Sequence, residues 1–404
     1  MTVFAKPKPA VENAGASRRR SAIDARRSRR LATAGVVALV AALSVVLVLL
    51  LVLGDRAVTP HPGSGERVNA SPSGTPTPTP AREPAAAHIT VCGTHLCLNG
   101  SSWYMNGASV YNPGLRPEQS GFLNPTGTVA LARGAGLNTI RIVNFFSDDG
   151  IPSATPYAET TWEQVDEMIA DAGAAGLHVD LDLSDYRNIL WNNCVNPYAS
   201  DWTAFIRFVA TRRNTVTGRI YADDPTIATL GISGEPLPVG THTFLAPATG
   251  QECTITYTTQ VLTDYYARTT GLWKRLGATV AVNPGGLGYL NEPTSGIDWK
   301  AIFALPTVDL CDIKTYGGML AYSGTVAAYC GSIGKPWIDE EFGWQQSDGD
   351  AQRATELRDM CREIFAEGAS GANFWNLGYQ VAPTSYDIGP ATPATFAAAR
   401  LCRP

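Results

Sequence analysis

Between residues 88 and 404, short apolar runs alternate with longer segments whose apolar residues recur at helical spacing. This order predicts parallel strands that are buried on both faces and connected by helices. The predicted strands are Trp103–Ala108, Leu137–Val143, Leu177–Leu183, Ile227–Ser233, Thr279–Asn283, Leu310–Tyr316, Pro336–Glu341 and Ala372–Trp375. The clearest helical patterns are Trp162–Ala172, Trp202–Thr211 and Ala351–Glu367. Eight strand-and-helix units in about 300 residues favour a (β/α)8 TIM barrel over a doubly wound open sheet, which usually has fewer strands.

Residues 31–53 form a different pattern, an uncharged run rich in Leu, Val and Ala. At about 1.5 Å per residue, such a run is long enough to span a hydrocarbon core of about 30 Å as a helix. Residues 1–30 carry nine Lys or Arg and two acidic residues, so the positive-inside rule places them in the cytoplasm and the rest of the chain outside. The alternative is a cleaved secretory signal, whose apolar region is usually only about 7–15 residues long.

Residues 54–87 are rich in Pro, Thr, Ser, Gly and Ala and have almost nothing to bury. Such a segment is typical of an extended, disordered spacer. We therefore predict a basic cytoplasmic tail (1–30), a transmembrane anchor (31–53), a linker (54–87) and one barrel domain (88–404). The predicted location of that domain is the extracytoplasmic face of the cell membrane, and the alternative is secretion.

The net charge of the chain argues about its binding partners, and its cysteines argue about its cross-links. The chain has a net charge of −5 and its first 30 residues carry +7, so the remainder carries −12, which argues against nucleic-acid binding. All eight cysteines follow the apolar run, and an even number in an oxidising compartment favours disulfides over metal ligation. Eight cysteines allow 105 pairings. Cys92–Cys97 would close a short hairpin, and Cys194–Cys253 would join two long loops.

Two predicted strands end in a glutamate, where barrel enzymes place their reacting groups. Glu235 follows Ile227–Ser233 and precedes a proline, and Glu341 ends Pro336–Glu341. A carboxylate at the end of an apolar strand is costly unless it is paired or functional. Two carboxylates across a barrel mouth suit glycosidic cleavage, with one as general acid and base and the other as nucleophile. This predicts Glu235 as the acid and base and Glu341 as the nucleophile.

The sequence around both glutamates resembles glycoside hydrolase family 5 of clan A. Residues 214–228, from Asn214 to Ala228, followed by Glu235-Pro236, look like the approach to strand four in endo-β-1,4-mannanases of that family. Residues 335–343 are similar to the strand-seven signature, in which the nucleophile directly precedes Phe-Gly. The resemblance therefore implies Glu341 rather than Glu340, and it extends more weakly over residues 103–379.

The resemblance also implies supporting residues. Arg141 matches the strand-two arginine that supports the nucleophile, Tyr316 the strand-six tyrosine that contacts it, and Trp375 the strand-eight platform under the sugar. Aromatic faces suit the apolar faces of sugars. Trp191, Trp344 and Tyr379 fall in loops of the same mouth and are candidates for stacking outer sugars. Asn144 is a candidate donor to a sugar hydroxyl or a turn residue.

Three positions depart from the family pattern. Gly234 stands where an asparagine usually precedes the acid and binds the 2-hydroxyl of the sugar, Lys314 replaces a strand-six histidine, and Ser184-Asp185 replaces a histidine after strand three. These changes leave the substrate open between β-1,4-mannan and β-1,4-glucan or another β-glycoside. Asn291-Glu292-Pro293 resembles the missing motif but follows strand five, where no acid is expected.

We therefore predict a retaining endo-glycanase, a monomer, that acts on polysaccharide or oligosaccharide, preferably β-1,4-mannan. The alternative from another class is a cell-surface carbohydrate-binding protein that has lost turnover. The membrane is the other predicted partner, through residues 31–53. The five histidines show no metal-ligand spacing, and the glycine-rich segments 284–288 and 317–318 lack the lysine of a phosphate loop, so we predict no metal and no cofactor.

Overall fold

Eight parallel strands form the centre of the computed structural model, which describes residues 88–111, 125–145 and 155–404. The strands are β4 (Met105–Tyr111), β5 (Thr139–Val143), β6 (His178–Asp182), β7 (Ile227–Gly231), β10 (Ala281–Asn283), β11 (Cys311–Tyr316), β12 (Trp337–Gly343) and β13 (Gly371–Phe374). Their order is β10-β7-β6-β5-β4-β13-β12-β11. A parallel bridge between Leu287, which follows β10, and Ile313 of β11 joins the two edges. The sheet is thus a TIM-like barrel.

All eight predicted strands are present, although their ends differ by a few residues. The largest difference concerns Trp103, which we placed in the first barrel strand. It instead ends β3 (Ser101–Trp103), and Tyr104 separates that short strand from β4. The barrel strands are almost entirely buried, which explains why their sequences read as continuous apolar runs.

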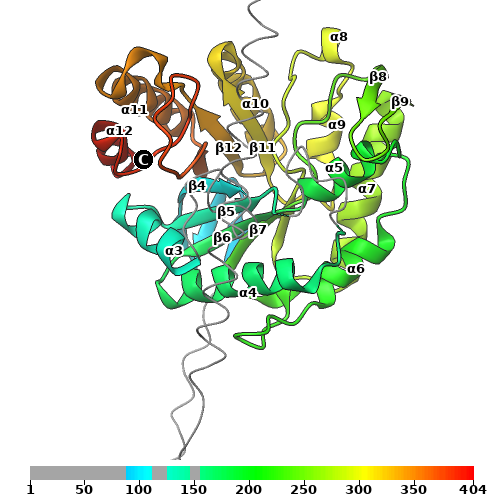
Figure 1. The fold of residues 1–404 in the computed structure, drawn as a ribbon, viewed down its shortest axis with the longest axis horizontal. Coiled ribbons are helices and arrows are strands. Elements are labelled where there is room, and N and C mark those ends of the chain that lie inside the picture. The colour runs from blue at the N-terminus through cyan, green and yellow to red at the C-terminus, as the bar shows by residue number, and fades with distance from the viewer. Residues whose placement is uncertain (1–87, 112–124, 146–154) are drawn as a thin grey trace, which may run out of the picture. The chain divides into compact units, whose positions relative to one another are not determined.

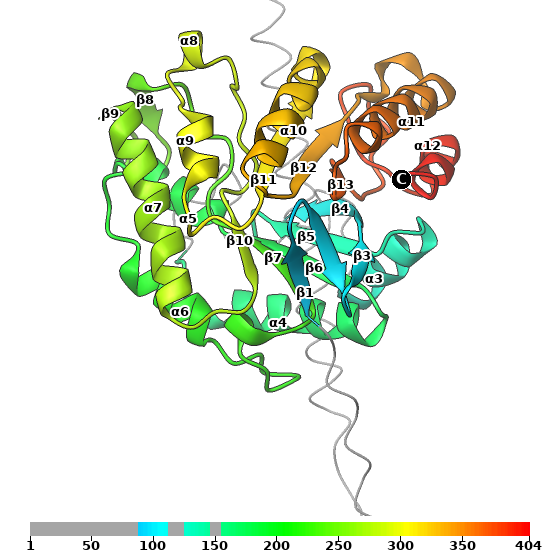
Figure 2. The ribbon, with the colours of Figure 1, turned by 180° about the vertical axis from the view of Figure 1, so that it is seen from behind.

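Helices surround the strands (Figures 1 and 2). They are α3 (Pro125–Gly134), α4 (Glu159–Ala174), α5 (Ser184–Asn192), α6 (Thr203–Thr211), α7 (Thr259–Arg275), α8 (Glu292–Ser295), α9 (Trp299–Ala304), α10 (Ser323–Ser332), α11 (Asp350–Ala366) and α12 (Pro393–Ala399). The three predicted helices correspond to α4, α6 and α11. In α6, Phe205, Ile206 and Val209 are buried, which is the one-sided spacing of a helix packed on a core.

A three-stranded antiparallel sheet lies before the barrel, and of this sheet the sequence predicted only the hairpin closed by Cys92–Cys97. The sheet consists of β1 (Ile89–Cys92), β2 (His95–Leu98) and β3. Ile89 and Leu96 form one apolar cluster with residues at the beginnings of the barrel strands, including Met105, Ala281 and Ile338. This sheet therefore covers the N-terminal end of the barrel, and Figure 2 shows β1 and β3 beside β4.

All eight cysteines form disulfides, and two of the bridges are the ones suggested from the sequence. These are Cys92–Cys97, between β1 and β2, and Cys194–Cys253. The other two are Cys311–Cys330 and Cys361–Cys402. Four bridges fit a domain that folds in an oxidising, extracytoplasmic compartment.

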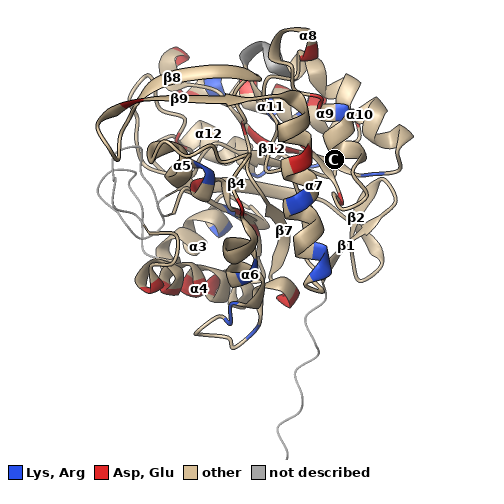
Figure 3. Ribbon diagram, turned by 90° about the vertical axis from the view of Figure 1, so that its right-hand side faces the viewer, with Lys and Arg blue, Asp and Glu red and all other residues tan. Residues whose placement is uncertain are grey.

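A second unpredicted element is the antiparallel hairpin of β8 (Gly240–Ala246) and β9 (Gln251–Tyr257). Exposed and less exposed residues alternate along both strands, as expected for a hairpin with one packed face. The Cys194–Cys253 disulfide joins β9 to the segment that follows α5. Figure 3 shows this hairpin.

The same view shows the charges of two helices. Helix α7 carries charges of both signs, and α4 carries acidic residues.

The predicted tail, anchor and linker, residues 1–30, 31–53 and 54–87, lie outside the described residues. A search of the described helices finds none that combines the length and apolar character needed to cross a membrane.

Candidate active site

Glu235 lies four residues beyond the end of β7, at the C-terminal end of the barrel. Its backbone is left-handed, with φ of 47°, and its amide donates to the carbonyl of Gly286 at 2.9 Å. Arg187 of α5 donates from Nη1 to the carbonyls of both Gly234 and Glu235. The amide of Gly234 donates to Ser184 Oγ at 2.8 Å. These contacts hold the Glu235 backbone in an uncommon conformation while 42% of its side chain stays exposed.

Glu341 lies within β12 and is only 5% exposed. Tyr316 OH donates to its Oε1 at 2.6 Å, and Arg141 Nη1 donates to its Oε2 at 2.8 Å. Lys314 Nζ lies 2.9 Å from the same Oε2. Burial raises the pKa of Glu341, but Lys314, Arg141 and the Tyr316 hydroxyl outweigh burial, so the pKa lies below the usual value of a glutamate. The carboxylate is therefore held ionised and oriented.

Lys314 joins the two glutamates. Its ammonium is 3.4 Å from Glu235 Oε2 and 2.9 Å from Glu341 Oε2. The two oxygens can be no farther apart than these distances combined, 6.3 Å. The structure therefore brings together, within one sugar-sized gap, two side chains that are 106 positions apart in the sequence.

Arg141 of β5 is fully buried under this gap and binds several partners. Nε donates to Glu340 Oε1 at 3.1 Å, Nη1 also donates to Ser109 Oγ at 3.0 Å, and Nη2 donates to Asp182 Oδ2. Burial raises the pKa of Glu340 well above its usual value. The adjacent glutamates of β12 thus differ. Glu340 is enclosed in the barrel interior, whereas Glu341 faces the gap with Glu235.

Other buried acids lie in the barrel interior. Burial raises the pKa of Asp180 to about 6 and that of Asp312 to about 8. Asp312 Oδ2 accepts from the amides of Gly285 and Gly286. Asp180 accepts from Thr229 at 2.7 Å and from Asn373 at 3.0 Å. Asp312 thus holds the backbone that follows β10, and Asp180 lies 4.0 Å from Arg141 Nε.

The predicted aromatic residues take different positions. Tyr316 contacts Glu341 as described, and its ring also makes an edge contact with Tyr386 at 5.5 Å. Trp375 follows β13, is half-buried, and stacks on Tyr111 of β4 with ring centroids 5.6 Å apart. Both residues occupy the C-terminal ends of their strands, at the same end of the barrel as the two glutamates.

The loop residues are more heterogeneous. Trp191 of α5 stacks on Phe244 of β8 with ring centroids 4.8 Å apart. Trp344 is half-buried, and its indole donates to Asp348 at 3.3 Å. Tyr379 is half-buried and packs against the core. Asn144 has a left-handed backbone with φ of 51°, a conformation that asparagine tolerates at turns.

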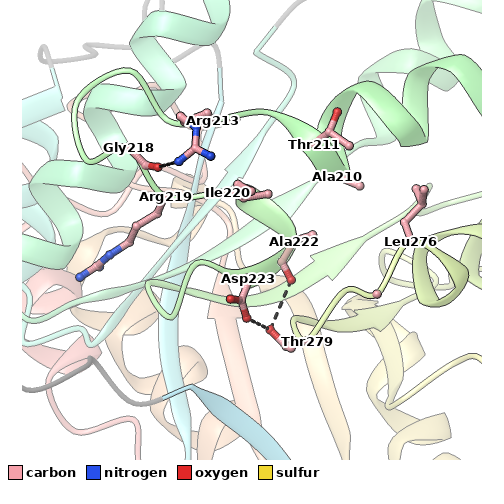
Figure 4. A pocket seen from close by; sticks show the side chains of 11 residues that line it. Ala210, Thr211, Arg213, Gly218, Arg219, Ile220, Ala222, Asp223, Leu276 and Thr279 are labelled. Atoms are coloured by element: carbon pink, nitrogen blue, oxygen red, sulfur yellow. Dashed lines mark hydrogen bonds between the residues drawn. The ribbon is translucent and has the colours of Figure 1, made fainter.

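A cavity of about 270 Å³ adjoins Glu235. Besides Glu235, its lining residues are Arg187, Asn188, Trp191, Tyr198, Leu237 and Tyr289. A larger hollow of about 550 Å³ is shown in Figure 4. Its lining residues, among them Asp223 and Thr279, precede β7 and β10, so it lies at the other end of the strands and contains none of the predicted site residues. The smaller cavity includes Glu235 but not Glu341, so it adjoins the gap between the two glutamates on the Glu235 side.

The structure explains why position 234, which departs from the family pattern, is a glycine. A Cβ atom on Gly234 would lie 1.8 Å from the carbonyl oxygen of Gly285, so no side chain fits there. The β10 exit occupies the space that an asparagine would need. Glu292 begins the short helix α8 and is exposed.

Sequence reasoning missed Arg187 as the residue that holds the Glu235 backbone, and it missed the bridging position of Lys314. Lys314 was visible as a departure, and its place two residues before Tyr316 on a strand puts both side chains on the same face. No sequence signal indicated this role of Arg187, because the contacts are to backbone carbonyls of residues 47 and 48 positions away.

Comparison with known proteins finds relatives in both sequence and structure. A mannan endo-1,4-beta-mannosidase from Arabidopsis thaliana is 28% identical over 166 residues, 36% of this chain and 40% of that protein. One from Oryza sativa subsp. japonica is 26% identical over 339 residues, 70% of this chain and 77% of that protein. An endo-1,4-beta-mannanase structure from Rhizomucor miehei aligns with a TM-score of 0.62 at 20% identity, covering 78% of this chain and all of that chain.

The chain resembles family 5 mannanases in sequence and in fold. A family 5 mannosidase structure from Rhizomucor miehei also aligns, with a TM-score of 0.56, 14% identity and 78% of this chain covered, and it supports the same fold. No family model matches the sequence. The match spans 40% of the length of the Arabidopsis relative. The relatives support the prediction of a glycoside hydrolase enzyme.

Proposed function

We propose that this mannanase-like protein is a retaining glycoside hydrolase that cleaves β-1,4-linked polysaccharide, with β-1,4-mannan as the preferred substrate. The observation that carries the proposal is the gap between Glu235 and Glu341. Lys314 limits the separation of their Oε2 atoms to 6.3 Å or less, a distance that accommodates the roughly 5–5.5 Å between the carboxyl groups of retaining enzymes. The two sequence relatives named as mannan endo-1,4-beta-mannosidases favour mannan.

In the proposed first step, Glu341 attacks the anomeric carbon while Glu235 gives its proton to the leaving oxygen and the glycosidic bond breaks. The lowered pKa of Glu341 suits a nucleophile that must be ionised. In the second step, Glu235 takes a proton from water, the water oxygen attacks the anomeric carbon, and Glu341 is released. Net retention follows from the two inversions.

The deciding experiment is hydrolysis of soluble β-mannan, β-glucan and xylan by the purified protein, with the anomer of the first product followed by proton NMR. We expect mannan to be hydrolysed fastest with retained configuration. A mechanism-based fluorosugar should label Glu341, and Glu341→Gln should lose activity by about 10⁴-fold or more while it stays folded. Inverted product, or a fully active Glu341→Gln variant, would contradict the mechanism.

We also propose that residues 31–53 anchor the enzyme to the membrane, with its catalytic domain outside the cytoplasm. The four disulfides support export. Membrane fractionation of the full chain and of a chain without residues 1–53 tests the anchor. The full chain should sediment with membranes and the shortened chain should not.

A further inference from the structure

Lys314 takes a position at the centre of the proposed reaction. It lies opposite Glu341 in the pairing of β11 with β12, directly after an irregularity in that pairing. Only 5% of its side chain is exposed. Its ammonium contacts one oxygen of Glu341 and one of Glu235. A buried cation between the proposed acid and nucleophile must therefore lie close to the sugar that is cleaved.

The surrounding backbone makes room for this side chain. A Cβ atom on Gly286 would lie 2.7 Å from Lys314 Cγ and 2.8 Å from Lys314 Cε, so a residue larger than glycine would displace the lysine stem. Gly286 has a left-handed φ of 86°, which glycine adopts without strain. Gly234 in turn leaves room for the carbonyl of Gly285. The Gly285-Gly286 segment that follows β10 therefore packs against Gly234 on one side and against the Lys314 side chain on the other.

The ammonium has a donor left for a ligand. An ammonium carries three N–H groups. In the part of the chain that the structure describes, its polar contacts are the two carboxylates. A sugar attacked by Glu341 and protonated through Glu235 would present two groups beside the anomeric carbon, the ring oxygen and the C2 hydroxyl. Positive charge develops on the anomeric carbon and the ring oxygen in the transition state, so a cation beside the ring oxygen would oppose the reaction.

We propose that Lys314 donates a hydrogen bond to the C2 hydroxyl of the sugar that is cleaved, and that it thereby discriminates between sugars that differ in configuration at C2. Mannose and glucose differ at that carbon alone. Lys314 therefore supplies, from β11, a contact that Gly234 cannot make, and it is a specificity determinant of the site. This role rests on the proposed glycosidase function.

The test compares 2,4-dinitrophenyl β-mannoside with 2,4-dinitrophenyl β-glucoside, which differs only in the configuration of the C2 hydroxyl. The activated leaving group makes protonation by Glu235 unnecessary in the first step. In the wild-type enzyme, we expect kcat/KM for the mannoside to exceed that for the glucoside about 10- to 100-fold. In Lys314→Met, that ratio should fall to within about threefold of one. Any effect of Lys314 on the ionisation of Glu341 applies to both substrates and cancels in the ratio.

Lys300→Met is the matched control, because Lys300 is an exposed lysine over the Trp299 ring and lies outside the site. It should keep the wild-type ratio. Lys314→Gln, which retains an N–H donor, should keep part of the preference, and circular dichroism checks that each variant is folded. An unchanged ratio in a folded Lys314→Met, or a wild-type ratio below about threefold, would overturn the role of Lys314. Failure of the wild-type enzyme to hydrolyse these glycosides and all three soluble polysaccharides would overturn the glycosidase function as well.

Discussion

The two ends of the barrel differ in chemical character, because one is apolar and the other holds buried charges. At the N-terminal end, Ile89 and Leu96 of the antiparallel sheet pack against apolar residues at the beginnings of the barrel strands. At the C-terminal end, Arg141 and Lys314 are buried among carboxylates. Burial of apolar groups stabilises a fold, whereas buried charges cost desolvation and are retained where they orient reacting groups. The apolar end therefore contributes mainly to stability, and the charged end is where we propose that the reaction takes place.

After Glu341→Gln, the largest effect should come from Glu235→Ala at the charged end. Without its acid, the enzyme should hydrolyse mannan about 10²- to 10⁴-fold more slowly, because the leaving oxygen departs unprotonated. The first step with a 2,4-dinitrophenyl glycoside should slow less than tenfold, since that leaving group needs no proton. Burst kinetics with both substrates measures the difference. Glu292→Ala, in the exposed tripeptide that resembles the family motif, is the control and should retain full activity.

At the apolar end, Leu96→Ala should lower stability without affecting turnover. Leu96 is fully buried, so truncation should cost about 2–5 kcal/mol and lower Tm by roughly 5–15 °C. Val91→Ala in the same small sheet should cost less than about 0.5 kcal/mol, because Val91 is 37% exposed. Thermal unfolding and kcat are measured on the same samples. A large loss of kcat in a folded Leu96→Ala would show that the two ends are not independent.

A pH profile sharpens the account of the charged end. The pKa of Glu341 is lowered, so the nucleophile stays ionised below the usual titration range of a glutamate, and the acid limb of kcat/KM should lie there. Lys314→Met removes the leading charge that lowers this pKa, so the acid limb should move to higher pH. Lys300→Met should leave the limb unchanged. An acid limb that does not move would show that Lys314 does not lower the pKa of Glu341.

The smallest effect should follow Trp191→Ala. Trp191 lines the cavity beside Glu235, but the stack on Phe244 covers one of its faces. We expect KM for mannan to rise by less than tenfold and kcat to change by less than twofold. The dinitrophenyl mannoside, which is a single sugar, should show no change. A loss of kcat on that small substrate would indicate that Trp191 supports the hairpin of β8 and β9 rather than an outer sugar.

The barrel and its two glutamates could be predicted from sequence because each depends on local pattern. Buried parallel strands read as apolar runs, and Glu235 and Glu341 stand where two of those runs end. The hairpin of β1 and β2 was predicted only from the spacing of Cys92 and Cys97, and β3 was missed, because these strands are three or four residues long and largely exposed on one side. The hairpin of β8 and β9 was missed because it interrupts the strand-and-helix order.

The arrangement around Lys314 was beyond sequence reasoning for a different reason. Gly234, Lys314 and the Gly285-Gly286 pair each appear as isolated departures along the chain. The structure brings them into contact. A Cβ atom on Gly234 would lie 1.8 Å from the carbonyl oxygen of Gly285, and one on Gly286 would lie 2.7 Å from Cγ of Lys314. Spacing along one sequence carries no information on such cross-strand distances.

The tight contact between Gly234 and Gly285 has a consequence for protein engineering. Grafting an asparagine onto position 234 to reproduce the family's usual contact would drive its Cβ into the neighbouring backbone. A side chain at position 234 would therefore need a change at position 285, and a side chain at position 286 would need a change at position 314.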